Sequence, residues 1–387
     1  MSICGVKRPL QIELPDADAD AGAKSSKGDF YSEGYNSQNI RKAIQILTKI
    51  SKRCTSRIGV IDTTLQTIPK DDRKHRSTLQ SERDELQRLM EYNRFLKKLD
   101  TTVPVADAQG IRWNRLSYSK KEYRGGRRYA NGVRVYAPSE KYPRSVSLQG
   151  CMRDLRVLLA GDRLIDIDMV NAFPTIAHYV ACRLGLSLPK LAYYSKDSTN
   201  RDLVLSSIME FHGIYSRDAA KELPITLLHG GSYDCWLREY NLSNKRGRLP
   251  FMESFSNDVK TLMARLLDHP QWATLRSDVR VHLVKTGKRK EMDQCGINRS
   301  TFAIILQELE DRALQSMVRT FRSNEWVVES LQFDGCLLRH RPDVDIEKTI
   351  QLAQAQIKKD VPGLEIVLKV KPLYKESLQP FWDALNE

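Results

Sequence analysis

The segment LIDIDMVNAFPTI, residues 164–176, begins as a strand and ends in a turn that leads into a helix. Side chains alternate between the two faces of a strand, so we expect Asp166 and Asp168 on the same face. A second pair of short strands, predicted within residues 327–338, presents Asp334 at its turn. Carboxylates that meet at two strand ends repel each other unless a cation lies between them. The segment therefore indicates either a metal site or strand-end aspartates held in ion pairs.

Magnesium suits such carboxylates, because it prefers oxygen ligands and also binds phosphate groups. Two magnesium ions held by Asp168 and Asp334 can stabilise both the attacking and the leaving oxygen of a phosphoryl transfer. We therefore predict a site for two Mg²⁺ ions at these residues, with Mn²⁺ as a substitute. Asp166 is interpreted as a structural partner of an arginine or as a secondary ligand.

The overall charge of the chain points to a polyanionic partner. Its 387 residues carry a formal net charge of +14, with a pI of about 9.4. Such an excess is typical of nucleic-acid-binding proteins, although a merely solubilising basic surface is the alternative. The seven cysteines form no CxxC pair, which argues against a zinc finger and suits a reducing compartment. The sequence has neither a signal-peptide pattern nor an apolar run of ~20 residues, so we expect a soluble intracellular protein that does not bind membranes.

Changes in composition and periodicity divide the chain into five segments. Residues 1–36 are polar and lack periodicity, which predicts a flexible tail. Residues 37–104 have the apolar spacing of two long antiparallel helices, for which a coiled-coil interaction arm is the alternative. Residues 105–185 contain the strand 163–168, residues 186–298 are mainly helical, and residues 299–387 hold a long helix, the strand pair, and a last helix and strand (364–371). Helices between a few antiparallel strands predict an α+β fold.

Two regions have the composition of nucleic-acid and nucleotide contacts. RLSYSKKEYRGGRRYANGVRVYAPSEKYPR, residues 115–144, interleaves tyrosines with arginines and lysines, which suits phosphates and bases; a solvated basic loop is the alternative. In RDAAKELPITLLHGG, residues 217–231, Arg217 and Lys221 share a helix face, and His229–Gly230 follow two turns later. That face is suited to a triphosphate, with Lys221 at the α and β phosphates, Arg217 at the γ phosphate and the ring near the base.

These motifs, in this order, resemble those of the family A DNA polymerases and their single-subunit RNA polymerase relatives. The spacing from Arg217 through Lys221 to Gly230 is similar to that of the family's fingers helix, and Asp168 and Asp334 match the carboxylates of its first and last palm motifs. The motif before the palm is matched by Gly132, Arg134, Leu148, Gln149, Arg153 and Arg156. The likeness covers residues 125–340 and is greatest to the compact, exonuclease-less polymerases of virophages and related mobile elements.

The resemblance implies a right-hand polymerase fold and a role for each matched residue. Residues 37–104 would form a helical-hairpin thumb, residues 186–298 the helical fingers, and residues 105–185 with 299–387 an antiparallel-sheet palm. The catalytic residues would be Asp168, Asp334 and Lys221. The incoming nucleotide would contact Arg217, Lys221, His229, Gly230 and Phe173, and the primer–template would contact Arg134, Gln149, Arg153 and Arg156.

Three positions depart from the family pattern. His229 replaces the fingers tyrosine, and Phe333 replaces the usual histidine before the second catalytic aspartate. Phe173 stands five residues beyond Asp168, where the family's DNA polymerases carry Glu and its RNA polymerases carry Gly. In that respect the turn is more similar to family B polymerases and reverse transcriptases, whose aromatic residue blocks a ribose 2′-hydroxyl. Phe173 therefore favours deoxynucleotides, with a core aromatic under the palm as the alternative.

The sequence thus predicts a DNA polymerase that adds dNTPs to a primer on a nucleic-acid template and lacks a proofreading exonuclease. A primase-like enzyme or RNA polymerase, a reverse transcriptase, and a non-catalytic nucleic-acid-binding protein with a decayed palm are the alternatives. Gln307 and Glu310 lie on the long helix predicted from residue 299, where the resemblance implies a glutamine that contacts the minor groove; we interpret them instead as charged helix surface. The sequence does not decide whether a helicase or another replication protein acts with this chain. It also does not distinguish the cytoplasm, the nucleus and a viral factory as its compartment.

Overall fold

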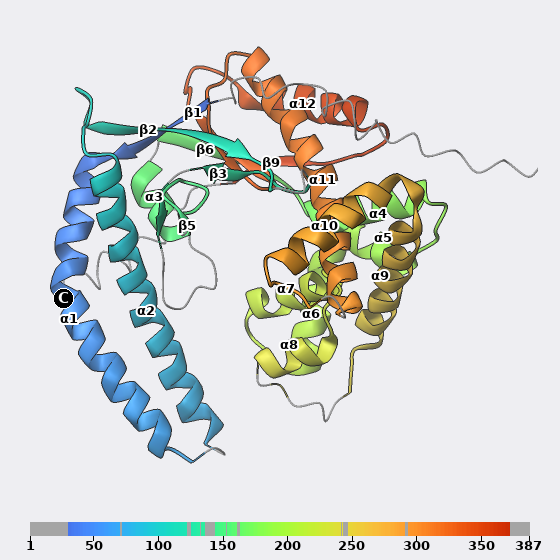
Figure 1. Ribbon diagram of the computed structural model, residues 1–387, viewed down its shortest axis with the longest axis horizontal. Coiled ribbons are helices and arrows are strands. Elements are labelled where there is room, and N and C mark those ends of the chain that lie inside the picture. Colours follow the sequence, from blue (N-terminus) through green and yellow to red (C-terminus); the bar gives the residue numbers. More distant parts are fainter. Residues whose placement is uncertain are drawn as a thin grey trace, which may run out of the picture.

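A four-stranded antiparallel sheet, in the order β7-β8-β6-β9, lies at the centre of the computed structural model. Its strands are β6 (Leu164–Met169), β7 (Val328–Gln332), β8 (Gly335–Arg339) and β9 (Leu368–Lys371). The structure describes residues 30–69, 72–121, 125–131, 133–135, 144–151, 153–160, 163–240, 242, 247–290 and 293–371. A long helical hairpin lies on one side of the molecule and a compact group of helices on the other (Figure 1).

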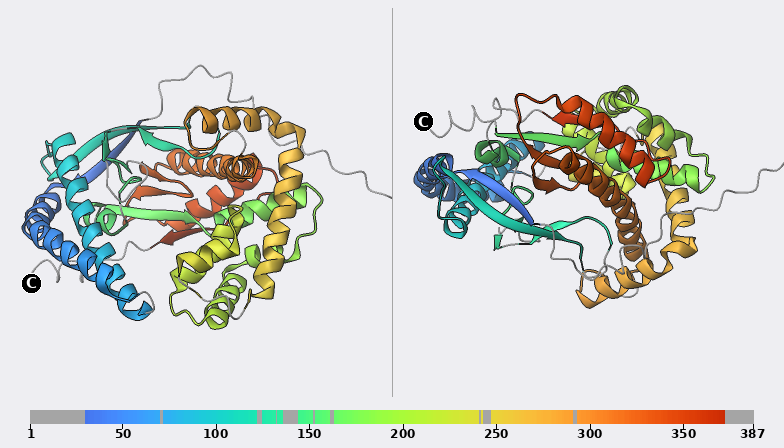
Figure 2. Two further views of the ribbon diagram at one scale, coloured as in Figure 1. Left: turned by 60° about the horizontal axis from the view of Figure 1, so that its bottom comes forward. Right: turned by 90° about the horizontal axis from the view of Figure 1, so that it is seen from above.

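Two helices, α11 (Gln294–Ser323) and α12 (Ile346–Asp360), pack on each other and on the sheet (Figures 1 and 2). Helix α11 is buried along most of its length and contributes Phe302, Leu309 and Phe321 to the main apolar core. The predicted last strand was too long. It begins only at Leu368: residues 361–363 form a turn, in which the Leu364 N–H donates to the Val361 carbonyl, and residues 364–367 have no regular secondary structure.

The helical lobe is made of the helices from α4 to α10, and it shares the main core with the sheet. These helices are α4 (Ala172–Arg183), α5 (Pro189–Lys196), α6 (Ser198–His212), α7 (Arg217–Leu228), α8 (Tyr233–Glu239), α9 (Pro250–Asp268), the short η3 (Pro270–Trp272) and α10 (Ala273–Lys285). Side chains of Asp197, Ser216 and Ser232 cap α6, α7 and α8 by accepting from backbone N–H groups of their first turns. Gly213 ends α6 in the left-handed conformation that glycine tolerates.

A second sheet, β1-β2-β3, joins the N-terminal part of the described chain to the centre. It consists of β1 (Phe30–Asn36), β2 (Ile111–Ser119) and β3 (Tyr129–Asn131), next to the two-stranded pair β4 (Arg134–Val135) and β5 (Arg144–Ser145). The prediction of a flexible tail over residues 1–36 is therefore wrong for 30–36, whereas 1–29 lie outside the described residues. The polar composition of β1 does not indicate that the strand is buried. Glu33 on this strand is nevertheless fully buried, and the Tyr35 and Tyr118 hydroxyl groups donate to its carboxyl group.

The helical hairpin consists of α1 (Ser37–Thr67) and α2 (Arg73–Thr102). The Asn36 and Asp72 side chains cap the two helices by accepting from N–H groups of their first turns. The end of the hairpin near the sheets packs on the rest of the described chain, through a second apolar core shared with α3 (Arg153–Ala160). That core includes Ile40, Leu47, Phe95, Leu96, Leu99, Leu155 and Leu159.

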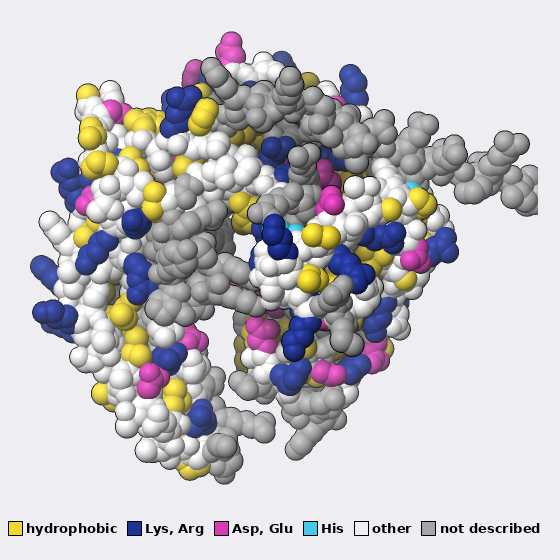
Figure 3. Space-filling model, in the orientation of Figure 1, with side chains coloured by type: hydrophobic (Ala, Val, Ile, Leu, Met, Phe, Trp, Pro, Cys, Tyr) yellow, Lys and Arg dark blue, Asp and Glu magenta, His cyan; other side chains and the backbone are white. Residues whose placement is uncertain are grey.

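An opening separates the hairpin from the helical lobe, and Lys and Arg side chains occur on both sides of it (Figure 3). The central sheet lies at the closed end of this opening (Figure 1). Among the helices of the described ranges, none combines the length and the apolar character that crossing a membrane requires.

Candidate active site

The two aspartates predicted to hold metal lie on adjoining chain segments of the central sheet. Asp168 on β6 is opposite Gly335 of β8, and the Met169 N–H donates to the Asp334 carbonyl at 2.9 Å. The tight β7–β8 turn needs an unusual backbone, with Phe333 at a φ of 46°. Gly335 has no room for a side chain, because a Cβ there would lie 2.2 Å from the Ile167 carbonyl oxygen. Asp334 is thus fixed beside the strand that carries Asp168.

The electrostatics of this pair fit a cation site. Burial, and next the negative charge of Asp334, raise the pKa of Asp168 to about 7, while the Lys371 ammonium acts against this rise. Lys371 Nζ lies 2.5 Å from Asp168 Oδ2. No cluster of three or more His, Cys, Asp or Glu in the described ranges forms a ready-made metal cage. Two carboxylates nevertheless suit Mg²⁺, which commonly takes its other ligands from water and substrate phosphates.

A buried ion pair that the sequence did not predict stands beside these aspartates. Glu310 on α11 is fully buried and binds the Arg127 guanidinium through both oxygens, with Arg127 Nη2 2.8 Å from Glu310 Oε1. Arg127 also lies over the Phe333 ring, 5.2 Å from its centroid. Burial alone would lower the pKa of Arg127, but Glu310 and then Asp334 raise it overall. The interpretation of Glu310 as charged surface is therefore wrong.

Further ion pairs hold the segment that precedes β3 against α11. Lys120 Nζ lies 2.7 Å from a Glu308 oxygen and 3.2 Å from Asp311, and Arg128 lies 3.2 Å from Asp311. The Gly126 N–H donates to Glu308 at 3.0 Å. Three acidic residues of one helix thus fix three cations of the basic segment, and Arg127 is the one that faces Asp334.

An aromatic stack lies next to this site. The rings of Phe173 on α4 and His229 at the end of α7 are nearly parallel, with their centroids 4.6 Å apart and 8° between their planes. His229 Nδ1 donates to the Ile225 carbonyl at 2.8 Å. Burial lowers the pKa of His229, and the positive charge of Arg127 lowers it further. The hydrogen bond to the Ile225 carbonyl raises this pKa but does not offset the burial. Gly230 follows at a φ of 72°, against the Arg299 side chain.

The predicted triphosphate contacts lie on the exposed face of α7. Arg217 and Lys221 are both exposed, and Arg217 forms an ion pair with Asp202 of α6. Pro224 sits inside the helix between these cations and His229. The fold therefore brings Asp168, Asp334, Phe173 and His229 to one region and leaves Arg217 and Lys221 accessible on the helix that carries His229.

The predicted primer–template residues have different surroundings. Gln149 is buried, accepts from the Ala130 N–H at 3.0 Å and donates to the Arg128 carbonyl at 3.1 Å, so it holds the chain where β3 begins. Arg156 donates to the Leu148 carbonyl at 3.0 Å. Arg134 lies on β4 and Arg153 begins α3. Their side chains and Gly132 lie outside the described part.

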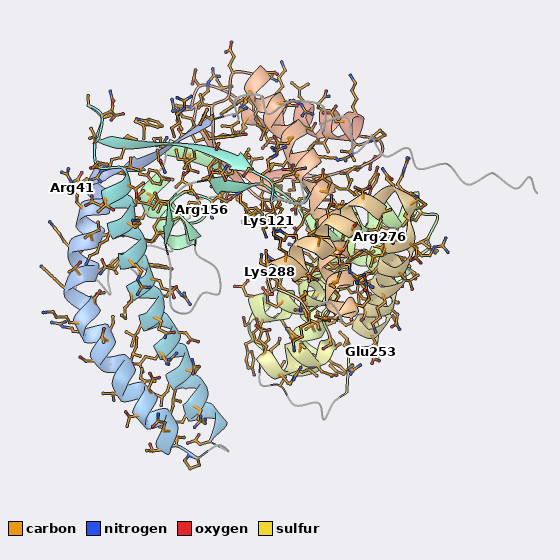
Figure 4. The ribbon with its side chains drawn as sticks, in the orientation of Figure 1. Arg41, Lys121, Arg156, Glu253, Arg276 and Lys288 are labelled. Atoms are coloured by element: carbon orange, nitrogen blue, oxygen red, sulfur yellow. The ribbon has the colours of Figure 1, made fainter. Side chains whose placement is uncertain are left out.

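Two lysines form a basic patch where the β2–β3 segment meets the α10–α11 connection. Lys121 and Lys288 come from these two segments and lie near each other at the opening (Figure 4). Desolvation, and then the charge of Lys288, lower the pKa of Lys121. Lys121 also lies over the Tyr129 ring, 4.8 Å from its centroid. Two like charges held together in this way favour an anion beside them.

Comparison with known proteins gives two similarities. No family model matches the chain. A protein of Sputnik virophage named "Putative helicase V13" is 26% identical over 224 residues, which are 58% of this chain and 26% of that protein. The POL domain of Pol1 from M. smegmatis, solved in complex with DNA primer-template and dNTP, shares 11% identity at a TM-score of 0.49, over 87% of this chain and 66% of that chain. The chain thus spans about a quarter of the virophage protein and just under two thirds of the POL domain chain.

Proposed function

We propose that the chain is a template-directed nucleic-acid polymerase, and specifically a DNA polymerase that extends a primer with dNTPs and has no proofreading exonuclease. The observation that carries this proposal is the pairing of Asp168 and Asp334 across adjoining strand ends at the closed end of a basic opening. Asp168, at 13% exposure, has lost much of its hydration beside a second carboxylate, so a divalent ion with a phosphate is a natural partner for the pair.

In this proposal Asp168 and Asp334 hold two Mg²⁺ ions. Bound there, the ions would neutralise charge on the reacting phosphoryl oxygens. Arg217 and Lys221 bind the triphosphate from the accessible face of α7. Arg127, kept charged by Glu310 and aimed at Asp334, holds the charge balance of the site and positions the β7–β8 turn through the Phe333 ring.

Phe173 decides which sugar is accepted. Its ring is almost wholly buried and is backed by the flat face of His229, so it cannot yield to an added hydroxyl group without breaking the stack. A rigid ring that excludes a 2′-hydroxyl group by contact selects dNTPs over rNTPs. His229 in turn forms part of the nucleotide pocket, next to Gly230.

The nucleic acid lies in the opening between the hairpin and the helical lobe. In the right-hand arrangement, residues 37–104 act as the thumb, 186–298 as the fingers, and 105–185 with 299–387 as the palm. Arg134 lies within the basic stretch, and Arg153 and Arg156 lie on α3, which packs on the hairpin. Gln149 contributes by fixing the backbone of that stretch.

The name of the virophage protein raises helicase activity as a second candidate. Nothing in the chain favours it, because the lone Gly-Lys pair of the sequence, Gly287–Lys288, is followed by Arg and no GxxxxGK[ST] phosphate loop occurs. A helicase elsewhere in a longer protein, or as a separate partner, is compatible with a polymerase of this size.

Primer extension tests the proposal. A labelled primer on DNA and RNA templates is incubated with Mg²⁺ and either dNTPs or rNTPs, beside an Asp334→Asn control. We expect extension with dNTPs that disappears in the control. Extension with rNTPs alone would overturn the sugar assignment, and template binding in EDTA without any extension would favour a binding protein with a decayed palm.

A further inference from the structure

A lysine already occupies the cation position on Asp168. Strand β9 runs antiparallel to β6, with Lys369 opposite Asp168 and Lys371 opposite Asp166. Of these two lysines, Lys371 forms the ion pair, with its Nζ 2.5 Å from Asp168 Oδ2. The carboxylate is largely buried at 13% exposure, whereas the lysine side chain is 51% exposed.

The two partners therefore differ in how freely they can move. Asp168 is fixed by the strand pairing on both sides of β6, between β8 and β9. Lys371 reaches it through a flexible four-carbon stem and can return to water at little cost, since a half-exposed ion pair is weak. This contrasts with the Arg127–Glu310 pair, whose carboxylate is fully buried and bound through both oxygens.

A divalent ion on Asp168 Oδ2 and an ammonium 2.5 Å from the same oxygen exclude each other, because like charges cannot share so short a separation at low cost. Arg127 faces Asp334, but without a cation on Asp168 the charge of that carboxylate would lie unscreened beside Asp334. Lys371 supplies the cation for Asp168 when no metal is bound.

We propose that Lys371 is an exchangeable internal cation of this site, which neutralises Asp168 in the metal-free protein and is displaced when a divalent metal ion binds. The inference rests on the proposed function, because it takes Asp168 to be a metal ligand. It also gives Lys371 a distinct role, which is to weaken metal binding until an incoming substrate adds phosphate ligands of its own.

Manganese binding tests this without any need for catalysis. Mn²⁺ is titrated into the full-length wild type, Lys371→Met and Lys371→Arg, and free Mn²⁺ is followed by electron paramagnetic resonance. Removal of one charge should tighten Mn²⁺ binding by about fivefold in Lys371→Met, the size of effect expected for a screened charge at this range. Lys371→Arg keeps the charge and should bind Mn²⁺ no more tightly than the wild type.

Lys369→Met is the matched control, since it removes the same charge from the same strand without the ion pair, and Mn²⁺ binding should change by less than about twofold. Equal or weaker Mn²⁺ binding in Lys371→Met overturns the inference, and so does an equal gain in Lys369→Met. Mn²⁺ binding that survives unchanged in Asp168→Asn also overturns it.

If primer extension succeeds while Lys371→Met binds Mn²⁺ like the wild type, only this inference fails. If no variant binds Mn²⁺ and no primer is extended, the proposed function fails with it.

Discussion

At the scale of single residues, Phe173 offers the most direct test of substrate choice. Replacement by leucine keeps an apolar side chain in the core but removes the flat ring that stacks on His229. We expect the preference for dNTPs over rNTPs, measured as the ratio of kcat/KM values, to fall by about 10- to 100-fold in Phe173→Leu. Single-nucleotide incorporation with matched dNTP and rNTP pairs measures this ratio.

His229→Ala is the companion variant, because it removes the other ring of the stack and leaves Phe173 in place. It should raise KM for both nucleotides and lower the sugar preference by less than Phe173→Leu does, because the Phe173 ring stays in place but loses the His229 ring that backs it. A preference that is unchanged in Phe173→Leu and lost in His229→Ala would assign sugar selection to the histidine.

Glu33 predicts a pH dependence of stability. Burial raises the pKa of Glu33 above the ordinary value of 4.5, although Tyr35, Tyr118 and the Leu148 N–H donate to its carboxyl. Between the unfolded and folded pKa values the folded state holds the proton more tightly. The contribution of Glu33 to the stability of the folded protein is therefore complete below the pKa that Glu33 has in the unfolded chain. It is lost as the pH rises through the pKa that Glu33 has in the folded protein.

Urea unfolding of the wild type and Glu33→Gln from pH 4 to 8 checks this sign. The wild type should lose stability with rising pH more steeply than Glu33→Gln, which carries no titrating group at that position. Glu85→Gln, at an exposed carboxyl group on α2, should keep the steep wild-type slope. Parallel slopes in the wild type and Glu33→Gln would show that this carboxyl group does not titrate on folding.

The placement of some residues in the candidate site was predictable from local sequence, and that of others was not. Asp168 and Asp334 were, because strand alternation and a turn signal place a carboxyl group at each strand end. The roles of Arg127 and Glu310 were not, since the charge of each is neutralised by a partner 183 positions away in the sequence. The Gly-Gly-Arg-Arg run and the high acidic content of an otherwise apolar helix were the available signals, and neither specifies a pairing.

At the scale of elements, Gly335 tests how closely β8 approaches β6. A Cβ at Gly335 would meet backbone atoms of Ile167 and Asp168 that cannot rotate away, so Gly335→Ala must separate the strands. We expect a loss of about 1–3 kcal/mol in stability together with loss of primer extension. Gly59→Ala is the control, because it lies on α1 with nothing within 4 Å of its Cβ and should stabilise that helix by about 0.5–1 kcal/mol. Thermal and urea unfolding measure both variants.

The periodicity of apolar residues predicted the long helices, but it did not predict short strands of polar composition. The hairpin helices α1 and α2 carry apolar residues at steps of three and four, and capping residues mark their starts. Strand β1 carries Glu33, and a glutamate reads as surface unless its partners are known. Those partners, Tyr118 and Leu148, come from two other segments, so only the tertiary structure explains the burial.

At the scale of the whole molecule, the sequence indicated a polyanion partner but not where the charge would gather. The order β7-β8-β6-β9 brings together strands from residues 164–169, 328–339 and 368–371, and no local pattern encodes that order. Folding also brings Lys121 and Lys288, from segments far apart in the sequence, to one side of the opening (Figure 4). Folding thus gathers part of the net charge of +14 at the opening, where it can attract a polyanion.

This arrangement predicts how nucleic-acid binding depends on salt. If Lys121 and Lys288 both contact backbone phosphates, the double variant Lys121→Gln/Lys288→Gln should reduce the slope of log K against log salt by about 2 for a duplex. Fluorescence anisotropy with a labelled primer–template in EDTA, over a series of salt concentrations, measures the slope without catalysis. Lys348→Gln/Lys359→Gln removes the same charge from exposed positions on α12 and should leave the slope nearly unchanged. An equal change in both double variants would mean that net charge alone attracts the nucleic acid. A change confined to the first would place a phosphate contact where the β2–β3 segment meets the α10–α11 connection.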